Sequence, residues 1–160
     1  MVRPVRASFL TLTFFALVVP NVGCSGSENE RLKGRIVYSD NGAVLVANGD
    51  GSEPVQISDH ALGNSYPAWS PDGSRIAFES DRDGDLEIFV MNDDGSDPIQ
   101  LTTNSNNDGF PQWSPDGSDI AFQTDRDGRS QFFVTGATGE NPRALGKNRV
   151  DGQSISWTSR

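Results

Sequence analysis

Acidic side chains gather in one short stretch of the sequence, where they could supply ligands for a metal ion. Four carboxylates fall within seven residues: Asp81, Asp83, Asp85 and Glu87. The first two recur 44 residues later as Asp125 and Asp127. Oxygen-rich loops of this kind can hold Ca²⁺. The pattern therefore predicts a candidate calcium site from five aspartates: Asp81, Asp83, Asp85, Asp125 and Asp127.

The same aspartates also have a purely structural interpretation. They stand in Asp-Arg-Asp-Gly segments at 81–84 and 125–128, and tight turns favour Asp and Gly for backbone reasons. The spacing differs from that of an EF-hand, because Gly84 is the fourth residue of its loop rather than the sixth. Arg129 replaces the third aspartate in the second copy. The turn interpretation is favoured, with calcium as the alternative and no other cofactor expected.

Other side chains give no catalytic constellation. The sequence has neither a Gly-x-Ser-x-Gly elbow nor a phosphate loop. Its single Cys and single His exclude a disulfide framework, a zinc cluster and a Cys/His pair, and His60 falls in a predicted loop. Acid/base catalysis on a sugar uses one pair of carboxylates that occurs once in the protein. The aspartates of this sequence instead repeat in each unit, together with the turns that contain them. We therefore predict no catalytic residue and no enzyme activity.

Two arginines repeat together with these acids. Arg82 and Arg126 each stand between two aspartates. They could pair with those aspartates or their cross-strand partners, or they could form an anion-binding ring at one mouth of the molecule.

These acids belong to a long repeat. Residues 67–91 read PAWSPDGSRIAFESDRDGDLEIFVM, and residues 111–134 read PQWSPDGSDIAFQTDRDGRSQFFV. Self-similarity with a period of roughly 40–45 residues is typical of propeller blades. Seven recurring residues have structural interpretations, as packing tryptophans between sheets or as turn residues: Trp69, Asp72, Gly73, Trp113, Asp116, Gly117 and Trp157.

Each full unit predicts four short antiparallel strands, which together form one blade. In the unit 64–103, Ser-Pro-Asp-Gly favours a turn between the first two strands. Ile76 and Phe78 alternate on one face of the second strand, and 86–91 is apolar on both faces, as a buried third strand requires. The units span about 34–60, 64–103 and 108–147.

The two end segments complement each other. The first unit lacks a Trp-bearing first strand, and 153–158 contains Trp157, 44 residues after Trp113, with no blade behind it. We expect an all-β fold, a partial β-propeller of about three four-stranded antiparallel blades. Two copies could exchange 153–158 and close a six-bladed homodimer. Alternatively, the chain is a truncated fragment of a larger propeller protein that stays open.

The first 24 residues have the pattern of a secretory signal peptide. Arg3 and Arg6 precede an apolar run from Phe9 to Val19, and small residues lead to Cys24. The segment resembles a bacterial lipoprotein signal with Cys24 as the lipidated residue, although Asn21 stands where that signal has an aliphatic residue. Residues 25–33 are polar and predict a tether. We expect secretion across the inner membrane and a periplasmic or cell-surface location, with the lipid as the only membrane contact.

The repeat resembles the β-propeller of the periplasmic TolB family, on the pattern Pro-x-Trp-Ser-Pro-Asp-Gly-x-x-Ile-Ala-Phe followed by Asp-Arg-Asp-Gly and Asp-Gly-Ser. The resemblance implies a cell-envelope module that binds envelope proteins without catalysis. A propeller that binds carbohydrate or another small ligand, with calcium, is the alternative. Nucleic acid is not an expected partner, because the formal charge of the chain is -9.

Overall fold

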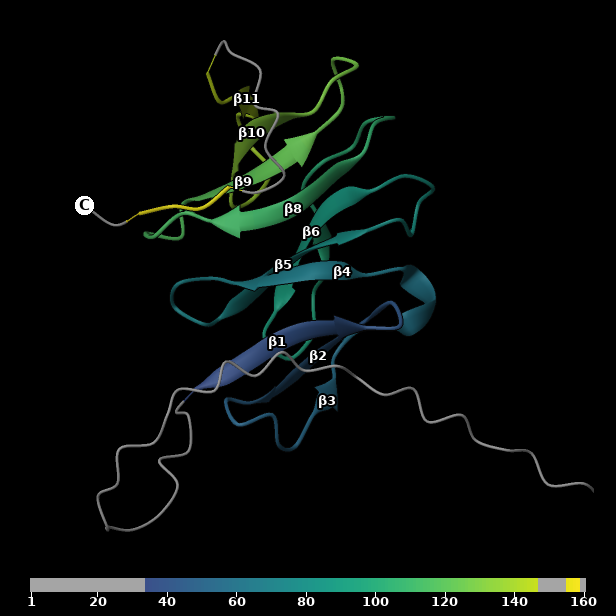
Figure 1. Ribbon diagram of the computed structural model, residues 1–160, viewed down its shortest axis with the longest axis vertical. Coiled ribbons are helices and arrows are strands. Elements are labelled where there is room, and N and C mark those ends of the chain that lie inside the picture. Colours follow the sequence, from purple (N-terminus) through teal and green to yellow (C-terminus); the bar gives the residue numbers. More distant parts are fainter. Residues whose placement is uncertain (1–33, 147–154, 159–160) are drawn as a thin grey trace, which may run out of the picture.

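The fold consists of three antiparallel sheets that follow one another along the chain (Figure 1). The computed structural model describes residues 34–146 and 155–158. The first sheet contains β1 (Arg35–Asp40), β2 (Ala43–Asn48) and β3 (Val55–Gln56). The second contains β4 (Ser65–Trp69), β5 (Arg75–Ser80), β6 (Glu87–Asn92) and β7 (Ile99–Gln100). The third contains β8 (Asp108–Trp113), β9 (Asp119–Thr124), β10 (Gln131–Gly136) and β11 (Arg143–Ala144).

This architecture confirms the predicted all-β partial propeller with three blades. The described residues include one short 3₁₀ helix, η1 (His60–Leu62), between the first two sheets. Among residues 34–146 and 155–158, the first sheet has three strands, and none of them corresponds to β4 and β8. No helix in the described part of the chain is long and apolar enough to cross a membrane. The predicted signal peptide, Cys24, the tether at 25–33 and residues 153–154 lie outside the described residues.

The Ser-Pro-Asp-Gly turn joins the first two strands of a blade through its own side chains. Asp72 accepts hydrogen bonds from Ser70 Oγ at 2.6 Å and from the Ser74 amide at 3.1 Å, and Gly73 has a φ of 70°. These bonds, above all the one from Ser70, lower the pKa of Asp72 to about 2. Asp116 and Gly117 form the same turn between β8 and β9. The same turn bonds therefore recur in both copies.

Apolar side chains fill the spaces between neighbouring sheets. Phe78 of β5 and Phe89 of β6 belong to a cluster with residues of β2, and their ring centroids lie 5.7 Å apart. A second cluster joins β5 and β6 to the third sheet and includes Trp113 and Phe122. Trp69 packs against the first cluster. Both tryptophans therefore lie in the apolar layers between sheets, and each sheet is held chiefly through its faces.

β4 and β8, which begin the second and third blades, lie on one side of the molecule together with β1. β1, β4 and β8 are each at the edge of a sheet, and neighbouring members of this set are in contact (Figure 1). We call the surface formed by these three strands the inner-strand face.

Candidate functional site

The five aspartates of the predicted calcium site are divided between two hairpin turns. Asp83 Oδ2 accepts a hydrogen bond from Gln100 Nε2 at 2.6 Å, and Asp127 Oδ2 accepts one from Gln131 Nε2 at 2.7 Å. Asp125 accepts hydrogen bonds from the backbone and side-chain nitrogens of Asn107.

The remaining two aspartates, Asp81 and Asp85, have separate surroundings. The carboxylate of Asp81 packs against Gly63, where an added Cβ would lie 2.0 Å from Asp81 Oδ1. Asp85 Oδ2 is buried and has no hydrogen-bond partner among the described residues. Within the described ranges, no group of three or more His, Cys, Asp or Glu side chains is arranged to hold a metal ion. The calcium site stays a prediction, and Asp85 is the member of the set whose buried oxygen has no partner among the described residues.

The two repeated arginines bind the starts of the inner strands and not the aspartates beside them. Arg126 Nη2 donates to Asp108 Oδ2 at 2.8 Å, and Arg82 Nη2 donates to Asn64 Oδ1 at 3.0 Å. Each guanidinium also lies 4.3 Å from the centre of a phenylalanine ring. Of the two expected kinds of partner, these bonds use the one across the neighbouring strand, and Asp83 acts on Arg82 through its charge. Both arginines are engaged within the protein, which leaves the anion-binding ring without support.

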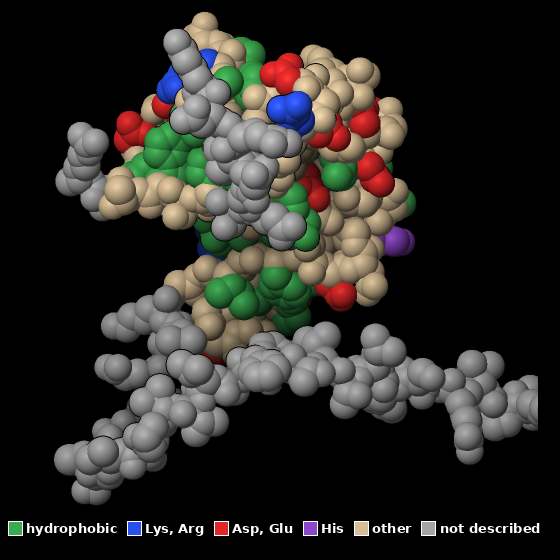
Figure 2. All heavy atoms as spheres, turned by 45° about the horizontal axis from the view of Figure 1, so that its top comes forward, with side chains coloured by type: hydrophobic (Ala, Val, Ile, Leu, Met, Phe, Trp, Pro, Cys, Tyr) green, Lys and Arg blue, Asp and Glu red, His purple; other side chains and the backbone are tan. Residues whose placement is uncertain are grey.

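His60 lies in η1, the short helix between the first two sheets. Its side chain is 72% exposed, and it projects from the surface in Figure 2.

Sequence reasoning missed an aromatic pair on the inner-strand face. Tyr66 in β4 and Phe110 in β8 both have left-handed backbone angles, with φ of 48° and 57°. A change of register accompanies each of them, so both strands carry a bulge at this point. The two ring centroids lie 4.4 Å apart at an interplanar angle of 56°, and Tyr66 is 55% exposed. The bulges thus bring two aromatic rings into tilted contact, with Tyr66 exposed and Phe110 half-buried.

The sequence does contain a signal for this pair. Tyr66 and Phe110 are 44 residues apart, and each directly precedes the proline of the Pro-x-Trp motif. A bulky residue with positive φ is uncommon, and such strain persists where the surrounding structure enforces it. A comparison by residue class, rather than by identity, would have included this position in the repeat.

A buried carboxylate fixes the bulge at Phe110. Glu79 of β5 is 4% exposed, and its Oε2 accepts the Phe110 amide hydrogen at 3.0 Å. Burial raises the pKa of Glu79, and the hydrogen bond from Phe110 opposes that rise. The approach also requires glycine at the preceding position, because a Cβ on Gly109 would lie 2.4 Å from Glu79 Oε2. The second blade therefore holds the bulge of the third.

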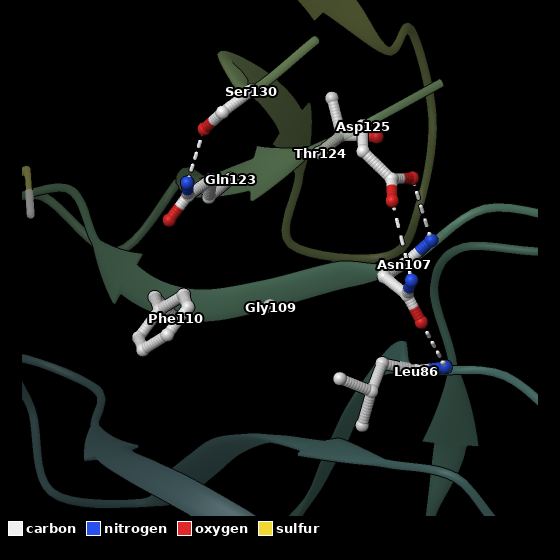
Figure 3. Close-up of a pocket in the computed structure, with 8 residues that line it drawn as sticks. All are labelled: Leu86, Asn107, Gly109, Phe110, Gln123, Thr124, Asp125 and Ser130. Atoms are coloured by element: carbon white, nitrogen blue, oxygen red, sulfur yellow. Dashed lines mark hydrogen bonds between the residues drawn. The ribbon is translucent and has the colours of Figure 1, made fainter. Parts of the chain in front are cut away.

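A small hollow opens beside Phe110 (Figure 3). Its volume is about 160 Å³, and Leu86, Gly109, Gln123 and Ser130 are among its lining residues. Asn107 closes one end by bonding to Asp125 and to the Leu86 amide. Gln123 Nε2 donates to Ser130 Oγ, while Gln123 Oε1 is buried and has no partner among the described residues. The hollow thus combines an aromatic wall with one amide oxygen that can still accept a hydrogen bond.

A second group of buried acids lies between the second and third blades. Glu87 is 1% exposed, and it accepts hydrogen bonds from Thr102 Oγ1 and, at 2.6 Å, from the Asn104 amide. Asn104 also donates to Asp108 Oδ2 at 2.7 Å. Burial raises the pKa of Glu87 from its usual 4.5 to about 7, and the nearby charges of Asp108 and Asp85 add to this rise. This junction can therefore change its proton content near neutral pH.

Comparison with known proteins now identifies the family. Residues 36–160 match the family model of the TolB beta propeller domain. The chain belongs to this family. A putative TolB from Agrobacterium tumefaciens is 25% identical with a TM-score of 0.59, over 64% of this chain and 40% of that one. TolB from Acinetobacter baumannii is 21% identical with a TM-score of 0.62, over 71% of this chain and 31% of that one.

Peptidase-type structures also resemble this TolB-family chain. A puromycin hydrolase is 20% identical with a TM-score of 0.55, over 66% of this chain and only 18% of the hydrolase. That likeness shows the fold alone. No curated protein matches the sequence. The chain thus spans less than half the length of each structure named here.

Proposed function

We propose that this chain is a non-catalytic β-propeller module of the bacterial cell envelope that binds a protein partner through its inner-strand face. The observation that carries the proposal is the pair formed by Tyr66 and Phe110. Aromatic side chains are enriched in protein interfaces because they bury much apolar area and fix few rotatable bonds. Here both are held by strained bulges in two successive blades, and Tyr66 is 55% exposed.

A protein segment suits this surface better than a small ligand does. Sites for small molecules usually enclose about 300–1,000 Å³. The hollow beside Phe110 has a volume of about 160 Å³, which leaves room for one side chain. A partner could insert a side chain there and lay its backbone across the two rings. A sugar stacked on Tyr66 is the alternative occupant.

The envelope location rests on the family and on the first 24 residues. The pattern that ends at Cys24 is that of a secreted lipoprotein, and the matched family is named for TolB. The proposal assigns a structural role to the acidic side chains of the turns. Asp83, Asp125 and Asp127 all accept hydrogen bonds within their own turns or from adjacent strands.

Site-specific photo-crosslinking in living cells tests the proposal. A photoreactive phenylalanine analogue at Tyr66 should give a defined crosslinked protein, and Phe110→Ala should reduce its yield. The matched control carries the analogue at Ile99, which is 56% exposed but lies on β7, away from the inner-strand face. Equal products from both positions, or a yield unaffected by Phe110→Ala, would contradict the proposal. Soluble oligosaccharide that abolishes the crosslink would favour the sugar-binding alternative.

Calcium-dependent binding is a second candidate function, and one observation favours it. Asp85 Oδ2 and Asp108 Oδ1 are both buried without a hydrogen-bond partner among the described residues, and both carboxylates act on Glu87. A metal ion would supply the missing partner for such oxygens. Calcium should then raise the melting temperature of the wild type and have less effect on Asp85→Asn. An unchanged melting temperature in millimolar Ca²⁺ would exclude this function.

A further inference from the structure

The edge of the first sheet at β1 lacks a strand that the other two blades possess. In the second blade β4 covers β5, and in the third blade β8 covers β9. Ile76 and Ile120 of the covered strands are 0% exposed. Ile36 stands at the same place in β1 and is 41% exposed. The apolar residue is therefore present, but its covering strand is absent from the described residues.

The missing strand also affects the hydrogen bonds of the repeated tryptophans, because one of the three has no acceptor among the described residues. Trp113 Nε1 donates to the Ala68 carbonyl of the preceding blade at 3.1 Å. Trp157 Nε1 repeats this bond with the Gln112 carbonyl at 3.2 Å. Trp69 Nε1 is buried and has no partner in the described part of the chain. Its acceptor would be a carbonyl of the missing strand, and leaving such a buried donor unpaired destabilises the fold.

Residues 155–158 are the counterpart of this gap. They correspond to the first strand of a blade, and the described residues contain no further strand of that blade. Trp157 is docked on the third blade through Gln112, as Trp113 is docked on the second through Ala68. Residues 155–158 are not part of any of the three sheets in the described part of the chain. Trp157 is 37% exposed, whereas Trp113 is 7% exposed. The segment therefore presents an aromatic side chain that the rest of a blade would cover.

The two incomplete edges fit each other in register. Trp69 pairs with Ile76 and Trp113 pairs with Ile120 in the complete blades. The same register pairs Trp157 with Ile36, and it pairs Ser156 with Val37, as Ala68 pairs with Ala77. The Ser156 carbonyl then takes the position of the Ala68 carbonyl and can accept the hydrogen bond of Trp69 Nε1. One strand addition would thus cover Ile36 and satisfy Trp69.

These edges lie at opposite ends of the row of sheets, with β1 at one end and residues 155–158 beside the blade at the other (Figure 1). We propose that a second copy of this chain supplies the missing strand. Residues 155–158 of each copy add to β1 of the other and complete its first blade. The product is a ring of six four-stranded blades with two-fold symmetry, within the four to eight blades of closed propellers. This proposal concerns the β1 edge, whereas the partner-binding proposal rests on Tyr66 of β4 and Phe110 of β8.

Disulfide trapping between two different chains tests the exchange. Full-length chains with Cys24→Ser are prepared with either Val37→Cys or Ser156→Cys, mixed, unfolded, refolded together and oxidised with diamide. The expected product is a disulfide-linked pair that contains one chain of each kind. The matched control replaces Val37→Cys by Val55→Cys, which is 60% exposed on β3 at the far edge of the same sheet. That mixture should give no linked pair.

Two results would overturn the proposal. The first is the absence of a linked pair from the Val37→Cys and Ser156→Cys mixture. The second is a crosslink within a single chain that carries both cysteines, which would mean that one copy closes on itself.

Sedimentation equilibrium gives a second, independent measurement. The unmodified fold should have the mass of two chains, and Trp157→Ala should weaken the association at least about tenfold, as for a buried interface tryptophan. Ile99→Ala should leave the association unchanged, because its side chain is not part of the exchanged edge. A folded protein with the mass of one chain would contradict strand exchange and would leave β1 to a segment from elsewhere.

Discussion

Asn64 and Asp108 occupy equivalent positions in successive repeats, and both accept a hydrogen bond from the arginine of the following hairpin. The acceptor oxygen is thus common to both repeats, whereas its charge is not. In the third blade the pair is an ion pair between Arg126 and Asp108, whose side chain is 0% exposed. Spacing indicates that these arginines have repeated partners. It cannot show that the partner comes from the start of an inner strand and not from the adjacent aspartate.

Glu87 should make the stability of the protein depend on pH around neutrality. Its folded-state pKa is about 7, above the usual 4.5, so the folded state holds this proton more tightly than the unfolded state does. The contribution to stability is therefore full below pH 4.5 and is lost as the pH rises to about 7. Compared with Glu87→Gln, the wild type should lose on the order of 3 kcal/mol of unfolding free energy between these limits.

Urea unfolding of both proteins at several pH values from 4.5 to 8 measures this difference. Glu140→Gln is the matched control, because the exposed Glu140 has its pKa lowered by a hydrogen bond from Thr138. The difference in unfolding free energy between wild type and Glu140→Gln should stay constant over the same range, because Glu87 titrates in both proteins. A constant difference between wild type and Glu87→Gln would refute the role of Glu87.

At the scale of the element, the inner strands combine predictable and unpredictable features. The turn after Trp69 follows from Ser-Pro-Asp-Gly, because each of these residues has a local preference for that conformation. The bulge at Phe110 depends on Glu79, which reaches it from another blade. A contact between residues 31 positions apart leaves no local pattern in the sequence. The strands and the recurring aromatic position were therefore predictable from periodicity, whereas the bulge that presents the aromatic pair was not.

Gly109→Ala tests whether Glu79 fixes this bulge. The new methyl group would lie 2.4 Å from Glu79 Oε2, so the carboxylate would have to leave the Phe110 amide. Overpacking of this kind costs about 1–3 kcal/mol. Ser65→Ala is the matched control, since Ser65 occupies the equivalent place in β4 and already has a Cβ. Thermal unfolding should show a clear loss for Gly109→Ala alone, and equal losses would show that the contact is unimportant.

At the scale of the whole molecule, the repeat predicted the number of sheets and the incomplete first blade. The repeat could not show the physical consequences of the missing strand. These are a buried Trp69 Nε1 without a partner among the described residues and an exposed Ile36 side chain, and both depend on the three-dimensional structure. Both features lie beside the open edge of β1. Residues 155–158 carry a carbonyl that can accept the hydrogen bond of Trp69 and a side chain that can cover Ile36. A three-bladed row with two open ends is thus converted by one exchange into a ring without open inner edges, which removes sites for uncontrolled strand pairing.

This closure predicts that stability depends on protein concentration. Partner binding that requires the folded state stabilises it by mass action, so the melting temperature of a strand-exchanged pair rises with chain concentration. We expect such a rise over a hundredfold range of concentration for the wild type. Trp157→Ala should melt at a constant temperature, because its exchanged strand no longer covers Ile36. Ile36→Ser should behave like Trp157→Ala, since the same contact is removed from the other side. Concentration dependence that persists in both variants would place the association elsewhere on the molecule.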